Sequence, residues 1–278
     1  MWHCPLCKTP ISLSASPIRC ENNHSFDKSK AGYVNLLPVQ FKRSKAPGDD
    51  KAMVRARKDF HQRNTYLPLK DRMIYLINEA LSQSKSAQQN IKVYDAGCGE
   101  GSYLSAVVSG LHANYTNVSG AGSDISKIAV EIAAKTNKHL QFVVASSFEL
   151  PLEDASQDII IQVFAPGSNK EYLRTLRKNG VLITVDPAPQ HLMQLKKLIY
   201  DKPKEHTLAR ETREGFSLVN SEVFQFAVEL SDDEHALSLV KMTPFYWTLP
   251  KGKIDTVISK LRTVSADFHI QVWRKNAC

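Results

Sequence analysis

The feature that most constrains the fold is a glycine-rich segment that directly follows an apolar run. The chain reads Val-Tyr-Asp-Ala-Gly-Cys-Gly-Glu-Gly from Val93 to Gly101. When a strand passes through such a segment into a helix, backbone N–H groups at the helix N-terminus face a ligand, and the glycines let that ligand approach the backbone closely. The segment therefore predicts a ligand site at the carboxyl end of a buried strand.

The spacing of the glycines discriminates between two kinds of ligand. A dinucleotide-binding loop has the pattern Gly-x-Gly-x-x-Gly, whereas here the third glycine comes one residue early. Asp95 also stands two residues before the first glycine, where its carboxylate would repel a pyrophosphate and attract an ammonium group. The pattern favours a ligand with an amino-acid part over a dinucleotide.

The same segment resembles motif I of the class I S-adenosylmethionine-dependent methyltransferases. The resemblance implies that Asp95, Gly97 and Gly99 lie against the methionine part of S-adenosylmethionine, with Glu100 beside them.

Two later positions match the same motif order. Asp124 follows Gly101 by 23 residues, where this fold places an acidic residue on the ribose hydroxyls. Ser146 and Ser147 stand after the third strand, near the expected position of the adenine. Cys98, inside the loop, is either a nucleophile or a buried small residue, and the second interpretation is favoured because no His has a suggestive spacing.

The pattern of apolar runs predicts an α/β fold with a mostly parallel sheet. Together with the resemblance of the glycine loop it implies the Rossmann-like fold of the class I methyltransferases, to which the cysteines near the N-terminus add a small zinc-binding module. Helices are expected near residues 102–110, 126–137, 169–178 and 189–201, and one amphipathic helix behind Pro68. Two late strands, at 223–230 and 268–274, suggest an antiparallel edge. Between them, Ser231 to Glu234 resembles a capping box at a helix start. The buried parallel strands are expected at 91–95, 118–124, 140–145, 158–164 and 180–186.

Two short-spaced pairs of metal-binding residues begin the chain. Cys4 and Cys7 form one pair, and Cys20 and His24 form the other. Four nitrogen and sulfur ligands complete a tetrahedron around Zn²⁺ and leave no open position, so such a zinc would be structural. His3 is an alternative to His24 as the fourth ligand, and reduced surface thiols are the alternative to a metal site.

The positive charge of the chain is concentrated near its N-terminus. Residues 1–90 hold 15 Lys and Arg against 7 Asp and Glu, and the remaining residues hold 21 of each. A local basic surplus attracts polyanions. Ten basic residues lie between residues 42 and 72. Phe41, Phe60 and Tyr66 stand beside or among them, and these rings could stack on bases or belong to a core. We expect RNA ahead of DNA.

These features divide the chain into three parts. Residues 1–35 are expected to be a zinc-binding RNA-recognition module, residues 36–72 a basic connector, and residues 73–278 the methyltransferase domain. No apolar run is long enough to span a bilayer, and the first residues lack the pattern of a secretory leader, so a cytoplasmic protein without a membrane partner is expected.

Several stretches together resemble the bacterial 23S rRNA guanine-N1-methyltransferases of the large-subunit methyltransferase A type. The resemblance implies zinc on the two metal-binding pairs, methyl transfer to N1 of a guanine in a hairpin loop of 23S rRNA, and homodimerisation. It also implies that Tyr66, Gly99, Glu100 and His191 contact the cofactor. The stretches are Cys4 to Cys7, Gly32 to Gln40, Pro47 to Asp49, Asp95 to Gly101, Val144 to Ser147, His191 to Met193, Leu198 to Tyr200 and Met242 to Phe245.

Guanine N1 must lose a proton, so a positioned base would assist the reaction. Asp186 and Glu100 are candidates, and the alternative for each is a cap or a cofactor contact. Phe164, after the fourth strand, could stack on a flipped guanine or be a core aromatic. Two other functions stay open: a methyltransferase of a small molecule or another RNA, and a non-catalytic zinc- and RNA-binding ribosome assembly protein.

Overall fold

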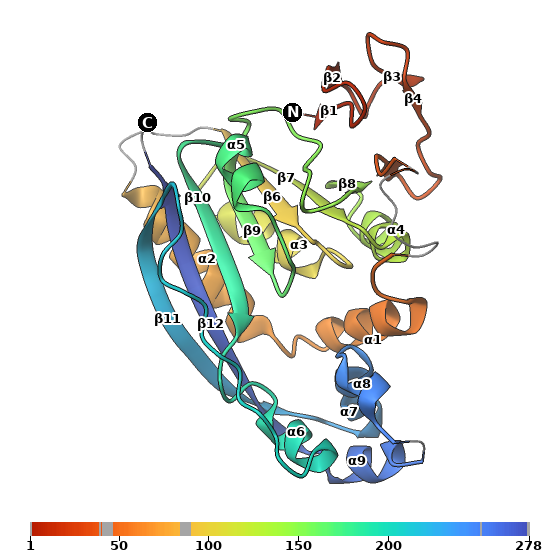
Figure 1. The fold of residues 1–278 in the computed structure, drawn as a ribbon, viewed down its shortest axis with the longest axis vertical. Helices are drawn as coiled ribbons and strands as arrows, with labels where there is room; N and C mark the ends of the chain where they lie inside the picture. The colour runs from red at the N-terminus through yellow and green to blue at the C-terminus, as the bar shows by residue number, and fades with distance from the viewer. Residues whose placement is uncertain (1, 39, 41–46, 84–89, 251, 277–278) are drawn as a thin grey trace.

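The computed structural model describes the whole chain except residues 1, 39, 41–46, 84–89, 251 and 277–278. Its centre is an eight-stranded sheet whose long strands cross the molecule (Figure 1). The strands of this sheet, in chain order, are β5 (Val34–Asn35), β6 (Asn90–Ala96), β7 (Asn117–Asp124), β8 (Gln141–Val144), β9 (Gln157–Val163), β10 (Leu176–Pro187), β11 (Phe216–Glu229) and β12 (Thr263–Lys275).

The sheet has the spatial order β11-β12-β10-β9-β6-β7-β8-β5. Every pair from β10 to β5 is parallel, and β12 is antiparallel to both β10 and β11. The predicted parallel sheet with an antiparallel edge is thus confirmed. The central strands are continuous apolar runs because helices or the N-terminal module cover both faces of the sheet.

The helices divide between the two faces. One face packs against α2 (Leu67–Ser82), α3 (Ser102–Leu111) and α4 (Lys127–Thr136), and the other against α5 (Asn169–Thr175) and the N-terminal module. A second group surrounds the far end of β11 and β12 in Figure 1. It comprises α6 (Met193–Ile199), α7 (Asp233–Lys241), α8 (Phe245–Thr248) and α9 (Ile254–Lys260), with α1 (Lys51–Gln62) packed on α7.

The N-terminal module consists of two small hairpins. β1 (Trp2–His3) pairs with β2 (Pro10–Ile11), and β3 (Ile18–Arg19) pairs with β4 (Ser25–Phe26). The Trp2 side chain docks this module on the sheet: it is 3% exposed, its ring meets Tyr94 edge-on at 6.1 Å, and its Nε1 donates to Gln141 Oε1 at 2.6 Å. The module therefore shares a hydrophobic core with the sheet.

Several predicted ends differ from the structure. The helix predicted at 169–178 stops at Thr175 because β10 already begins at Leu176. The helix predicted at 189–201 spans only Met193–Ile199. The expected capping box at Ser231 is wrong: Asp232 is the N-cap, and its carboxylate accepts from the His235 N–H at 2.7 Å. Among the described helices, none is long and apolar enough to cross a bilayer.

Candidate functional site

The glycine-rich loop lies at the carboxyl end of β6, between the ends of β7 and β9. Gly97 N donates to Ser123 O of β7 at 2.8 Å, which ties the loop to one neighbour. On the other side, a Cβ on Gly97 would stand 2.4 Å from Ala165 Cβ, and φ of Gly97 is +93°. Only a glycine has room here, so the loop packs directly on the turn that follows β9.

Asp124, at the end of β7, connects two backbone segments. Its Oδ2 accepts from Gly99 N at 3.0 Å, and its Oδ1 accepts from Ser126 N at 2.8 Å. Burial raises the pKa of Asp124, while these two hydrogen bonds act in the opposite direction. The carboxylate therefore fixes the glycine loop against the start of α4, and its contact with a ribose stays a prediction.

Buried polar atoms without a partner surround the loop. Within the part of the chain that the structure describes, they include Asp95 Oδ1, Glu100 Oε1, Tyr66 Oη, Tyr103 Oη and His61 Nδ1. A buried polar group without a hydrogen bond costs free energy, so such atoms call for an explanation. Two carboxylates beside a glycine loop suit the ammonium group of a methionine, and the phenols and the imidazole offer further hydrogen bonds, so this set of groups fits S-adenosylmethionine.

The electrostatics of the loop favour a positively charged ligand. Burial, with the nearby Asp124 and Glu100 carboxylates, raises the pKa of Asp95 well above its ordinary value. Burial lowers the pKa of His61 to about 4, so this imidazole is neutral at physiological pH. A cation near Asp95 would favour the ionised carboxylate and relieve the repulsion among the three acidic groups.

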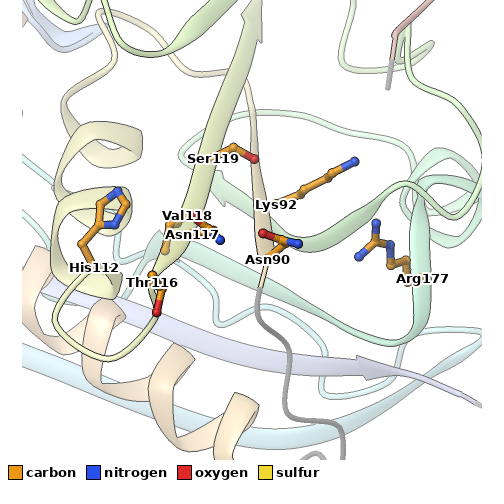
Figure 2. Close-up of a pocket in the computed structure, with 8 residues that line it drawn as sticks. All are labelled: Asn90, Lys92, His112, Thr116, Asn117, Val118, Ser119 and Arg177. Carbon is orange, nitrogen blue, oxygen red and sulfur yellow. The ribbon is translucent and has the colours of Figure 1, made fainter.

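Ser146 lines a cleft of about 590 Å³ together with Ile125 and residues of the N-terminal module, including His3 and Lys8. This cleft adjoins the loops after β7 and β8, where the adenine is expected. A larger cleft of about 830 Å³ lies at the opposite, amino ends of β6 and β7 (Figure 2). It contains none of the predicted site residues.

Phe164 stands directly after β9 and departs from strand geometry. In a regular strand, successive side chains alternate between the two faces of the sheet. Val163 of β9 is paired with Val185 of β10, so the next residues, Phe164 and Asp186, would point to the same face. Instead φ of Phe164 is +52°, and its ring lies 5.5 Å from Phe268 and 6.0 Å from His191. Phe164 is nevertheless 42% exposed, so part of this residue is accessible to a ligand.

His191 belongs to the same aromatic group and is 9% exposed. Its Nδ1 accepts the Asp267 N–H at 3.3 Å, and burial, with the charges of His206 and Lys196, lowers its pKa to about 3. The imidazole is therefore neutral and carries its proton on Nε2. His191 can donate a hydrogen bond to a ligand, and it is unsuited to act as a base.

Asp186 lies on the other face of the sheet from the Phe164 ring. It is half-buried, and burial raises its pKa against the opposing influence of His269 and Arg213. The structure thus brings Phe164 and His191 together and places Asp186 at the end of the adjacent strand, on the opposite face of the sheet.

Cys4, Cys7, Cys20 and His24 converge in the N-terminal module. Their ligand atoms all lie within 4.8 Å of one another. Cys7 Sγ is 3.7 Å from Cys20 Sγ, and two sulfurs bound to one tetrahedral zinc stand about 3.8 Å apart. His24 Nδ1 is 3.4 Å from Cys20 Sγ and 3.5 Å from Cys4 Sγ. This donor set fits zinc, and the cluster does not include His3.

The structure corrects the expected role of the basic stretch. Phe60 is 0% and Tyr66 2% exposed, so neither ring is a surface for stacking bases. Arg63 pairs with Asp232, Arg72 binds Glu222 through two hydrogen bonds of 2.6 Å, and Lys70 is buried. Phe41, Lys42, Arg43 and Lys45 lie outside the described residues.

The comparisons with known proteins agree with this site. Residues 2–45 match a zinc-ribbon family model described as "RlmA, N-terminal", and residues 87–240 match a methyltransferase domain. A Bacillus subtilis relative, YxjB, provisionally named a 23S rRNA (guanine-N(1)-)-methyltransferase, is 31% identical over 98% of this chain and 95% of its own. The chain belongs to this methyltransferase family. A further member, the 23S rRNA (guanine(748)-N(1))-methyltransferase of Streptomyces fradiae, is 32% identical over 93% of this chain and 90% of its own.

Among solved structures, the Bacillus subtilis protein YcgJ covers 75% of this chain and 98% of its own, with 16% identity and a TM-score of 0.46. Membership in the methyltransferase family accounts for both the S-adenosylmethionine-type loop and the zinc ribbon.

Three residues at the loop escape sequence-based prediction: Arg57, His61 and Tyr103. Arg57 and His61 lie on α1, whose high charge conceals its helical periodicity. One signal was available, because Asp50 is an N-cap residue that accepts from Met53 N at 2.8 Å. Tyr103 stands at the start of α3, where an aromatic residue looks like an ordinary core position.

The metal site yields a prediction for the whole protein. Cys7→Ser removes one of four ligands, so the purified variant should lose its one equivalent of zinc, and its unfolding midpoint should fall because metal binding stabilises a module this small. Zinc released to a chromogenic chelator after denaturation measures the content. Cys98→Ser is the control, because this buried thiol lies in the glycine loop and should leave the zinc content unchanged. A Cys7→Ser protein with full zinc would contradict the assignment.

Proposed function

We propose that the protein transfers the methyl group of S-adenosylmethionine to N1 of a guanine in a hairpin loop of 23S rRNA. One observation carries the proposal: Gly97 of the cofactor loop packs on Ala165, the residue next to the exposed Phe164. The cofactor site and a surface suited to stacking on a nucleobase are therefore in direct contact. The curated names of the family members supply the nucleotide and the atom.

The chain's main task is alignment, because bound S-adenosylmethionine supplies an already activated methyl group. Asp95 and Glu100 are placed to attract the ammonium group. Asp124 is placed at the edge where a ribose would lie, and Ser146 and Ile125 border the cleft where an adenine would lie. Tyr66 and His191 would donate hydrogen bonds from Oη and Nε2.

The acceptor guanine would stack on the exposed side of Phe164. The positive φ of Phe164 is unusual for a bulky residue, and such strain is found mainly where the surrounding structure requires one orientation of a side chain. Phe268 and His191 pack against the ring, so the guanine would join an existing aromatic group.

Asp186 would take the proton from guanine N1. Its carboxylate has no hydrogen-bond partner among the described residues, and it stands at the end of β10, next to the end of β9 that carries Phe164. A base with a raised pKa is a better proton acceptor for this step. Glu100 is the weaker candidate, because it lies 6% exposed inside the cofactor loop.

The RNA would extend from this site over the zinc module and α1. Within the described part of α1, Lys51 and Arg55 are exposed and Lys58 is half-buried, and no ion pair involves them. We retain residues 1–35 as the RNA-recognition module, 36–72 as the connector and 73–278 as the methyltransferase domain. An rRNA substrate would place the protein in the cytoplasm, and homodimerisation is proposed from the family resemblance.

The proposal is tested by methyl transfer to RNA. The purified protein and S-adenosylmethionine with a labelled methyl group should modify 23S rRNA that lacks its own modification, and mass spectrometry of the digested RNA should find 1-methylguanosine in a hairpin loop. Label on small metabolites without label on RNA, or label on another atom of the base, would contradict the proposal. Phe164→Ala should bind the cofactor normally and transfer the methyl group at least ten-fold more slowly.

The role of Asp186 predicts a change in pH dependence. The wild-type single-turnover rate should fall as the pH drops through the raised pKa of Asp186, because the protonated carboxyl cannot accept a proton. Asp186→Asn should be slowed about 100-fold or more at neutral pH and should gain rate as the pH rises toward the pKa of guanine N1. Asp201→Asn, an exposed carboxylate elsewhere on the surface, is the matched control. An Asp186→Asn enzyme with wild-type rate at neutral pH would exclude this base.

A further inference from the structure

The cofactor proposed above carries three charges, and the described loop residues account for two of them. Asp95, Glu100 and Asp124 gather around the glycine loop. Asp95 and Glu100 suit the ammonium group of S-adenosylmethionine, and the negative charge of all three carboxylates suits its sulfonium group. The same three carboxylates would repel the α-carboxylate of its methionine part. A cation at the loop would offset this repulsion and bind the carboxylate.

Arg57 of α1 brings a cation close to the loop backbone. Its Nη1 would stand 3.6 Å from a Cβ on Gly99, and its guanidinium interacts electrostatically with Glu100 and Asp124. Its Nη2 forms an ion pair of 2.6 Å with Asp49 Oδ2, and the side chain is 24% exposed. No partner for Nη1 occurs among the residues that the structure describes.

Arg57 is also held in place from the protein side. Ser126 Oγ, at the start of α4, donates to Asp49 O at 2.9 Å, and Gly48 packs against Ser126 so closely that a Cβ there would approach Ser126 Cβ to 2.8 Å. The segment before α1 is thereby fastened to the loop after β7. Asp49 then fixes one side of the guanidinium and leaves the other directed at Gly99.

Two other basic groups near the loop fit the α-carboxylate less well. His61 is neutral, because burial lowers its pKa to about 4. The Lys70 ammonium is directed at the ring of Tyr103, 5.7 Å from its centroid, and burial lowers its pKa. An arginine also presents two parallel N–H groups to a carboxylate, which an ammonium cannot do.

We propose that Arg57 binds the α-carboxylate of S-adenosylmethionine and that Asp49 positions its guanidinium. The inference rests on the proposed function and adds to it a cofactor-recognition role for α1. It also separates Arg57 from the neighbouring basic residues of α1, which remain available to RNA.

Decarboxylated S-adenosylmethionine tests this assignment, because it keeps the sulfonium and ammonium groups and lacks the carboxylate. Calorimetric titration should show that Arg57→Met weakens binding of S-adenosylmethionine about 30-fold or more. The same variant should bind the decarboxylated compound as tightly as the wild type or more tightly, since a repulsive positive charge has been removed. Retained binding of that compound also shows that the variant is folded.

Two further variants sharpen the result. Arg55→Met removes an exposed arginine from the same helix and should change neither affinity. Asp49→Asn should weaken S-adenosylmethionine binding less than Arg57→Met does. The guanidinium is still present in this variant and loses only the ion pair with Asp49 that positions it.

Equal losses for both compounds in Arg57→Met, or no loss for either, would overturn the assignment. So would a selective loss of S-adenosylmethionine binding in Lys70→Met with none in Arg57→Met. Because the titration contains no RNA, these outcomes do not depend on which nucleotide is methylated. A wild-type protein that binds neither compound would overturn the proposed function, and this inference with it.

Discussion

The close packing of Gly97 against Ala165 is the contact on which the site depends. β6 lies between β7 and β9 in a parallel sheet, so the carboxyl ends of all three strands meet at one edge. At that edge the glycine loop and the turn after β9 are pressed together, with no space for even one methyl group on Gly97. A donor held by the loop and an acceptor held by the turn must consequently be neighbours, and this proximity is what a methyl transfer requires.

The second constraint is electrostatic. Asp95 is 1% and Glu100 6% exposed, and Asp124 faces the same loop, so three carboxylates stand where they repel one another. Burying them without compensation would destabilise the fold. The arrangement is understandable if a cationic ligand is bound there and if α1 contributes a guanidinium. The basic stretch therefore serves two purposes: part of it completes the cofactor site and forms internal ion pairs, and part of it stays exposed on α1.

The sequence predicts the parallel strands well because each is a buried apolar run bounded by turn residues, and it predicts the zinc ligands because their spacing is set by local geometry. It does not predict α1, where Val54 and Phe60 are the large apolar residues buried among many charges. It also leaves open whether Phe60 and Tyr66 stack on bases or belong to a core, and the structure places both in the core. The relation of Phe164 to Asp186 could not be derived from alternation, because a single positive φ turns the Phe164 ring to the other face.

The cofactor loop and the Phe164 turn are proposed to form one reaction site. A crystal structure of the protein with sinefungin, a non-reactive analogue of the cofactor, and the substrate hairpin tests it most directly. We expect one guanine stacked on the exposed side of the Phe164 ring, with its N1 about 3–3.5 Å from the analogue's amine that replaces the transferable methyl. A guanine bound away from Phe164, or an analogue bound away from the glycine loop, would contradict it.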